Sequence, residues 1–315
     1  GGASFMHDAP AHMLASSTLR GSSEKGAAHP TTLERLRKAG GSSGELVVML
    51  RQPFKLAYSQ YVYCHGVLHR ERYPALDVWL RNFGRTPART SFHCYDPTNI
   101  QTRFTGALGY RNNQAFGPLD PKGVSVERSK AQLESNFSFV GIVDAYKESL
   151  CLFRATATRD VPPSSCACGG KSKHPGKLNK ITHGTPQHSL SELEEGQLRK
   201  LGRMIELDVL LYCHALYLFE IRIRHVEART GVRIGCASKI EALWADVLGY
   251  ACALTSGRQR LIQSLRRYGK PGCPPTAPAS TYVNISRPPG LHASSTTKSK
   301  KVTHAQASDR PLLNI

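Results

Sequence analysis

The sequence predicts an α/β fold, with a central parallel sheet and helices on both of its faces. Two short apolar runs, Leu46–Leu50 and Ser138–Asp144, have the length and composition of buried strands. A helical pattern follows each run, beginning at Pro53 and at Ala145. Strands that alternate with helices are typical of βα units, and such units build parallel sheets.

The first of these units carries a candidate anion-binding residue. Arg51 directly follows the first predicted strand, and Ser59 lies two turns into the helix that begins at Pro53. In open α/β sheets, ligands bind beyond the carboxyl ends of the strands. A guanidinium group there fits a phosphate through paired, charge-assisted hydrogen bonds, and a serine hydroxyl can add a donor. A βα unit with a purely structural arginine at its turn is the equally simple alternative.

The charge of the chain indicates the class of its partners. The 315 residues have a formal net charge of +19, and 40% of them are hydrophobic, which suits one or two globular domains. A strongly basic chain favours polyanions such as nucleotide phosphates, anionic glycans, nucleic acid or a membrane surface. No segment has the pattern of a membrane span, because the best candidate, Leu207–Ile223, contains His214 and Glu220.

Composition divides the chain into three parts. Residues 1–44 are rich in Ala, Ser and Gly, and we expect them to be poorly ordered. Residues 45–244 hold the periodic hydrophobic patterns and form the predicted domain. Residues 245–315 are rich in Pro, Ser, Thr and Lys, which predicts a disordered basic tail. Deletion of the tail from Ser256 onward is therefore expected to leave the melting temperature unchanged.

The nine cysteines do not form a zinc-binding pattern, and no metal site is expected. Cys166 and Cys168 are one residue apart, and no CxxC pair occurs. Two sequons, at Asn136 and Asn284, permit N-glycosylation in a secretory lumen, where disulfides also form. These features are compatible with a glycoprotein.

Four segments resemble one enzyme family, in the order in which that family has them. They are LRQPFKLAYSQYVY from Leu50, NIQTRF from Asn99, FVGIVD with the following SLCL from Phe139, and DVLLYCHALYLFE from Asp208. Together they resemble the Golgi-type carbohydrate sulfotransferases that use 3'-phosphoadenosine 5'-phosphosulfate (PAPS), which are related to heparan and chondroitin sulfotransferases. Gln52 stands where the family usually has an acidic residue, and Asp144 replaces the usual glutamate.

The resemblance implies a P-loop-like sulfotransferase fold and a set of nucleotide-binding residues. These residues are Arg51, Ser59, Lys177, Asn179 and Lys180. The first two would hold the 3'-phosphate of the nucleotide. The other three lie in a basic loop, within residues 162–188, that would close over the nucleotide. A flexible surface loop has the same composition.

Two further residues have implied roles toward the acceptor. His29 lies 22 residues before Arg51, a spacing comparable to that of the catalytic base in heparan and chondroitin sulfotransferases. Histidine suits the removal of a hydroxyl proton because its pKa lies near neutrality. A solvent-exposed loop histidine is the simpler alternative. Arg103 would bind a sugar acid or a sulfate, but an arginine in a structural salt bridge fits the segment as well.

One diagnostic motif of the family is missing. The family binds the 5'-phosphosulfate with a Pro-Lys-x-Gly-[Ser/Thr] loop ahead of the LR-x-P segment, and residues 1–50 contain no such loop. We therefore expect either an N-terminally incomplete chain, with the loop upstream, or a protein that does not work as an enzyme.

The resemblance implies transfer of a sulfuryl group from PAPS to a hydroxyl of a glycan. The expected partners are a glycan or polysaccharide acceptor and the nucleotide, with no nucleic acid. The expected location is the Golgi lumen, as a type II membrane protein whose anchor lies outside this sequence. A non-catalytic protein of the same fold that binds polyanions or nucleotides is the alternative.

Overall fold

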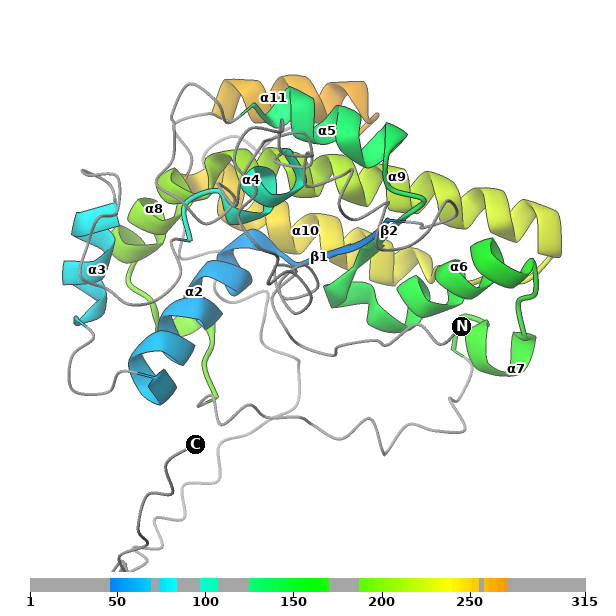
Figure 1. The fold of residues 1–315 in the computed structure, drawn as a ribbon, viewed down its shortest axis with the longest axis horizontal. Coiled ribbons are helices and arrows are strands. Elements are labelled where there is room, and N and C mark those ends of the chain that lie inside the picture. Colours follow the sequence, from blue (N-terminus) through cyan, green and yellow to red (C-terminus); the bar gives the residue numbers. More distant parts are fainter. Residues whose placement is uncertain are drawn as a thin grey trace, which may run out of the picture.

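Helices dominate the structure, and two short strands form a parallel pair at its centre (Figure 1). The computed structural model describes residues 46–68, 74–83, 97–106, 125–169, 187–254 and 258–270. In the view of Figure 1, α4, α5, α9 and α11 lie above the strand pair, and α2 and α6 lie below it. The fold is therefore mostly helical, with a small parallel sheet packed against helices.

Each strand leads into a helix. Strand β1 (Val47–Leu50) is followed by α2 (Pro53–Tyr63), and β2 (Phe139–Ile142) passes through a 3₁₀ turn (Val143–Ala145) into α6 (Tyr146–Thr158). The remaining elements are a π-helical turn (Cys64–Leu68), α3 (Leu76–Phe83), α4 (Ile100–Gly106), α5 (Val126–Ser135), α7 (Pro163–Cys166), a second 3₁₀ turn (Leu190–Glu192), α8 (Glu195–Met204), α9 (Glu206–Thr230), α10 (Ala237–Leu254) and α11 (Arg258–Arg267).

The strand pair has a register that sets Met49 opposite Gly141. Glycine suits this position, because a Cβ atom at residue 141 would clash with the sulfur of Met49, and that side chain would have to move. Every residue of β2 is buried, whereas burial alternates along β1. Since the strands are parallel, the turns that follow them lie at the same edge of the sheet.

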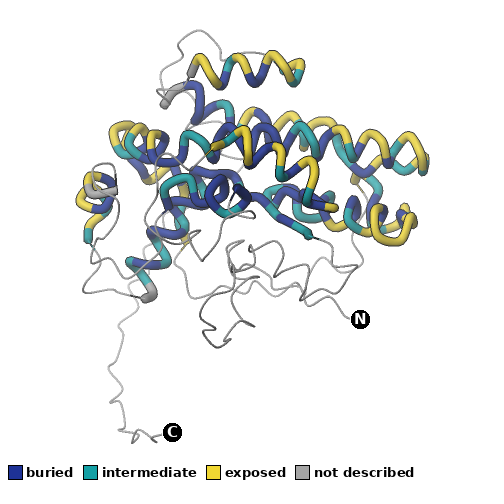
Figure 2. The backbone as a smooth tube through the Cα atoms, turned by 45° about the horizontal axis from the view of Figure 1, so that its top comes forward, coloured by how far each residue is buried: buried dark blue, intermediate teal, exposed yellow. Residues whose placement is uncertain are grey.

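Helix α9 is the central element of the molecule. It packs against β2 and against α2, α4, α5, α6, α10 and α11. Residues 208–216 are all buried, so the first half of α9 has no exposed face (Figure 2). His214 lies in this half as a core residue. Its Nδ1 is 3.0 Å from the Tyr268 hydroxyl, and its Nε2 is 2.9 Å from a Glu134 carboxylate oxygen, in ion-pair range.

The predicted fold class holds at a coarse level. Both predicted strands and the helices after them are present, and they pair in parallel as βα units. The predicted central sheet is larger than the observed one, because the described residues form only two strands. The second strand also ends earlier than expected, since Val143–Ala145 already forms a 3₁₀ turn.

The C-terminal boundary predicted at residue 244 is wrong. Helix α10 continues through Leu254, and α11 packs against α9 and α10. Leu261 and Leu265, one turn apart on α11, are both buried, while the opposite face is polar and basic. Composition concealed this amphipathic helix because its exposed side chains are mainly arginine and glutamine.

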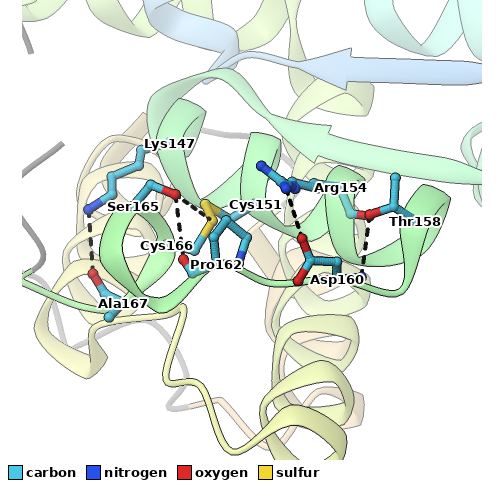
Figure 3. The surroundings of a disulfide bond; sticks show 9 residues. All are labelled: Lys147, Cys151, Arg154, Thr158, Asp160, Pro162, Ser165, Cys166 and Ala167. Carbon is cyan, nitrogen blue, oxygen red and sulfur yellow. Dashed lines mark hydrogen bonds and ion pairs between the residues drawn. A yellow bond between two sulfur atoms is a disulfide. The ribbon is translucent and has the colours of Figure 1, made fainter. Parts of the chain in front are cut away.

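Two disulfides join described residues. Cys151 of α6 bonds Cys166 at the end of α7 (Figure 3), and Cys168 bonds Cys236 just before α10. Cys64 and Cys252 are also disulfide-bonded, whereas Cys213 is a free, buried thiol. Disulfides persist in oxidising compartments, so the chain suits an extracellular or lumenal location. Among the described helices, none has the length and apolar character needed to cross a membrane.

Candidate functional site

Arg51 lies at the carboxyl end of β1, where the sequence predicted it. The residue is half-buried, and its guanidinium group has no hydrogen-bond or ion-pair partner within the described part of the chain. Strand β1 ends one residue earlier, and α2 begins two residues later with Pro53 at its first position. Among the described residues, this cation is therefore unpaired at the edge of the sheet where ligands bind in α/β folds.

The backbone of Arg51 is held by the side chain of Gln101 from α4. The Arg51 N–H donates to Gln101 Oε1 over 2.9 Å, and Gln101 Nε2 donates to the Arg51 carbonyl over 3.0 Å. The amide thus pairs with Arg51 as a neighbouring strand residue would. Gln101 is buried, so water does not compete for these bonds.

The next peptide group is held by Asp144, from the turn that follows β2. Its Oδ2 accepts the Gln52 N–H over 2.9 Å and the Tyr212 hydroxyl over 3.2 Å. Asp144 therefore joins the turns after the two strands and connects both to α9. Gln52 caps α2, because its Oε1 accepts the Lys55 N–H over 2.8 Å.

The NIQTRF segment connects this site to the start of α9. Asn99 has a positive φ of 47°, which asparagine tolerates, and its Oδ1 accepts the Leu207 N–H over 2.9 Å. Asp208 accepts the N–H of Gln101 over 3.1 Å, together with the N–H and hydroxyl of Thr102, each over 2.7 Å. Each polar side chain named here satisfies a backbone group or a buried carboxylate.

Asp208 is the buried carboxylate of the site, with 1% of its surface exposed. Burial raises the pKa of Asp208 to about 6, although hydrogen bonds from Thr102 and Gln101 and the charge of Arg103 oppose the rise. At neutral pH the carboxylate is therefore ionised, and it can accept all three hydrogen bonds.

Lys55 is occupied by carboxylates and is not available to an anion. Its Nζ lies 2.7 Å from Asp246 and 3.7 Å from Asp144. Burial lowers the pKa of Lys55, but these two charges outweigh it and leave the pKa raised. Ser59 lies one turn further along the same face of α2, half-buried, with no hydroxyl partner in the described ranges.

Arg103 is placed inside the fold, not at its surface. It lies on α4 with 6% of its surface exposed, and its charge lowers the pKa of Asp208. This position suits the structural alternative considered above, and its role toward an acceptor stays a prediction.

Four of the predicted site residues lie outside the described ranges. They are His29, Lys177, Asn179 and Lys180. Of the described site residues, Arg51 and Ser59 belong to one βα unit, and Arg103 lies on α4. Within the described residues, no group of three or more His, Cys, Asp or Glu side chains is arranged to hold a metal ion.

Sequence reasoning missed the supporting residues Gln101, Asp144 and Asp208. All three belong to segments that carried the family resemblance, so their places in those segments were a usable signal. Family models, curated proteins and solved structures contain no match to this chain.

Proposed function

We propose that this protein transfers a sulfuryl group from PAPS to a hydroxyl of a glycan. The observation that carries the proposal is the half-buried guanidinium of Arg51 at the carboxyl end of β1, which has no partner among the residues that the structure describes. Its neighbouring peptide groups are held by Gln101 and Asp144. An arginine presented on a backbone held in this way is suited to grip a phosphate with its planar fork.

Arg51 and Ser59 bind the 3'-phosphate in this proposal, with Lys177, Asn179 and Lys180 as further nucleotide ligands. The sulfur–oxygen bond of the phosphosulfate breaks as a new one forms to the acceptor hydroxyl. The hydroxyl proton passes to a base, for which His29 is the candidate. The products are 3'-phosphoadenosine 5'-phosphate and the sulfated glycan. Arg103 is the proposed ligand for an acidic group of the acceptor.

The proposed location is the Golgi lumen. The two disulfides between described residues support an oxidising compartment. The Asn136 sequon lies at the C-terminal end of α5, with Asn136 partly exposed and Ser138 exposed. A glycan at Asn136 would lie at the amino end of β2, opposite the edge that carries Arg51.

Nucleotide binding is tested with 3'-phosphoadenosine 5'-phosphate by titration calorimetry. Arg51→Ala should weaken binding about tenfold to a hundredfold, because it removes a charge-assisted contact of roughly 1.5–3 kcal/mol. Adenosine 5'-phosphate, which lacks the 3'-phosphate, should bind both proteins alike. Arg199→Ala, on the exposed face of α8, is the matched control. Equal affinity of wild type and Arg51→Ala for the bisphosphate would rule the assignment out.

A non-catalytic polyanion-binding protein is the second candidate, and α11 favours it. Arg266 and Arg267 are exposed there, and residues 258–270 contain no acid. Transfer of labelled sulfate to a glycan would exclude this second candidate. We expect the 315-residue chain to bind nucleotide without transferring sulfate, because residues 1–50 lack the Pro-Lys-x-Gly loop that stabilises the leaving group. Transfer to a glycan by this chain would show that other residues supply that stabilisation.

A further inference from the structure

We propose that Gln101 and Asp144 are positioning residues that hold Arg51 ready for the 3'-phosphate. This inference rests on the proposed function. In the proposed arrangement these two residues do not touch the nucleotide. They bind the backbone of Arg51, whose side chain binds the phosphate.

The Arg51–Gln52 dipeptide has four backbone hydrogen-bonding groups, and all four are satisfied. Only one bond is local, from the Leu56 N–H to the Gln52 carbonyl over 2.9 Å. The other three are made by side chains that are distant in sequence. Gln101 takes both groups of Arg51, and Asp144 takes the N–H of Gln52.

A strand end normally needs no such support, because a neighbouring strand or water satisfies its groups. Here the described residues form only two strands, so no third strand is present among them to satisfy the backbone groups of Arg51. A buried glutamine replaces the missing strand with one donor and one acceptor, spaced as a peptide group would space them.

Gln101 and Asp144 are both held in turn by residues of helix α9. Gln101 is held through its own N–H by Asp208, and Asp144 is held by the Tyr212 hydroxyl. Asp208 and Tyr212 are four residues apart on α9 and therefore share a face. The path from α9 to Arg51 and back is thus a closed ring of hydrogen bonds through α4 and both strand turns.

A ring of this kind limits where the Arg51 guanidinium can lie. The side chain has four rotatable bonds of its own, but its starting point and direction are set by φ and ψ of a backbone that cannot shift without breaking buried bonds. Binding then costs less conformational entropy, and the fork meets the phosphate in one orientation. A loose backbone would keep the charge but lose this alignment.

The test uses Gln101→Leu, which removes both amide bonds at similar volume. Affinity for 3'-phosphoadenosine 5'-phosphate should fall about tenfold, and affinity for adenosine 5'-phosphate should not change. In an Arg51→Ala background, Gln101→Leu should cause no further loss, because it acts only through Arg51. Gln101→Glu, which keeps the acceptor but loses the donor, should lie between. Gln263→Leu, at an exposed position of α11, is the control.

Amide hydrogen exchange provides a readout that needs no ligand. In Gln101→Leu the Arg51 amide should exchange faster, while amides in the middle of α9 should keep their protection if the protein remains folded. Asp144→Asn keeps an acceptor for the Gln52 N–H and should retain most of the affinity, because the positioning depends on the geometry of this hydrogen bond and not on the charge of Asp144.

The outcomes separate the two proposals. If wild type prefers the bisphosphate and Arg51→Ala loses that preference, while Gln101→Leu binds as wild type does, the positioning role is wrong and the proposed function stands. If folded wild type has no preference for the bisphosphate over adenosine 5'-phosphate, the proposed function fails, and the positioning role fails with it. Equal losses for both nucleotides in Gln101→Leu would mean general damage and would also overturn the proposal.

Discussion

At the scale of single residues, Asp208 is the point on which the buried contacts of the site converge. It accepts three hydrogen bonds from two residues of α4 and has almost no exposed surface. A buried carboxylate is costly unless it is paired, and here the donors and the charge of Arg103 offset only part of the cost. The part of the cost that is not offset raises the pKa of Asp208.

This raised pKa predicts a pH dependence of stability. Since the pKa of Asp208 moves from 3.8 in the unfolded chain to about 6 in the fold, the folded state binds more protons between these values. Its contribution to the free energy of unfolding therefore falls as pH rises from about 4 to about 6, and is constant above that. Asp208→Asn should remove this contribution, as measured by urea unfolding across the range.

The quantity to compare at each pH is the difference in the free energy of unfolding between wild type and Asp208→Asn. The contributions of the other titrating groups cancel in this difference. Parallel stability profiles for wild type and Asp208→Asn would show that Asp208 titrates alike in the folded and unfolded states. Asp246→Asn removes a partly exposed carboxylate that pairs with Lys55, and it serves as the control at a different position.

At the scale of elements, α11 decides where the domain ends. Its buried leucines pack against α9 and α10, and two ion pairs hold its ends. Arg260 lies 2.9 Å from Glu206, and Lys270 lies 2.7 Å from Glu220 and also over the ring of Trp244. Figure 2 shows the outward side of this helix as exposed. The expectation that deletion from Ser256 leaves stability unchanged is therefore replaced by its opposite.

Helix α11 is expected to contribute measurably to the free energy of unfolding. Leu265 is fully buried, so Leu265→Ala should cost about 2–5 kcal/mol by loss of burial and formation of a cavity. Gln263→Ala, on the exposed face two residues away, should change stability by no more than about 0.5 kcal/mol. Chemical unfolding of the two full-length variants tests this. If both unfold at the wild-type midpoint, α11 is not part of the folded unit.

At the scale of the whole molecule, two disulfides connect the short α7 segment to other parts of the fold. Cys166 and Cys168 flank a single residue, yet they bond in opposite directions, to α6 and to the segment before α10. The backbone adds to this link, because the Cys168 N–H donates to the Arg233 carbonyl over 2.7 Å. The small α7 segment is thereby anchored on both sides.

The longer of these links predicts a large effect on stability. The Cys168–Cys236 bond spans 68 residues, and removing it with Cys168→Ser and Cys236→Ser together should cost about 2–4 kcal/mol, because the unfolded chain regains conformational freedom. Unfolding midpoints in non-reducing buffer measure this loss. A reductant should lower the wild-type midpoint more than that of the double variant. Equal midpoints without reductant would mean that the bond does not form.

The sequence by itself determined the local features of this protein. The two apolar runs that become strands and the proline that begins α2 follow from patterns within a few residues. Such patterns depend on backbone preferences and on which face is apolar, and both act over one or two turns of chain. The placement of Arg51 at a strand end could therefore be predicted without the fold.

Only the tertiary structure decided what supports Arg51. Gln101 lies 50 residues away from it along the chain, and Asp208 lies 107 residues from Gln101. No local pattern distinguishes a glutamine that pairs with a distant backbone from one that faces water. The same holds for α9, on which the apolar Ile221 is exposed whereas the charged Asp208 is buried. Burial on a central helix is set by the elements that surround it, because each neighbour covers a face that periodicity alone would leave to solvent.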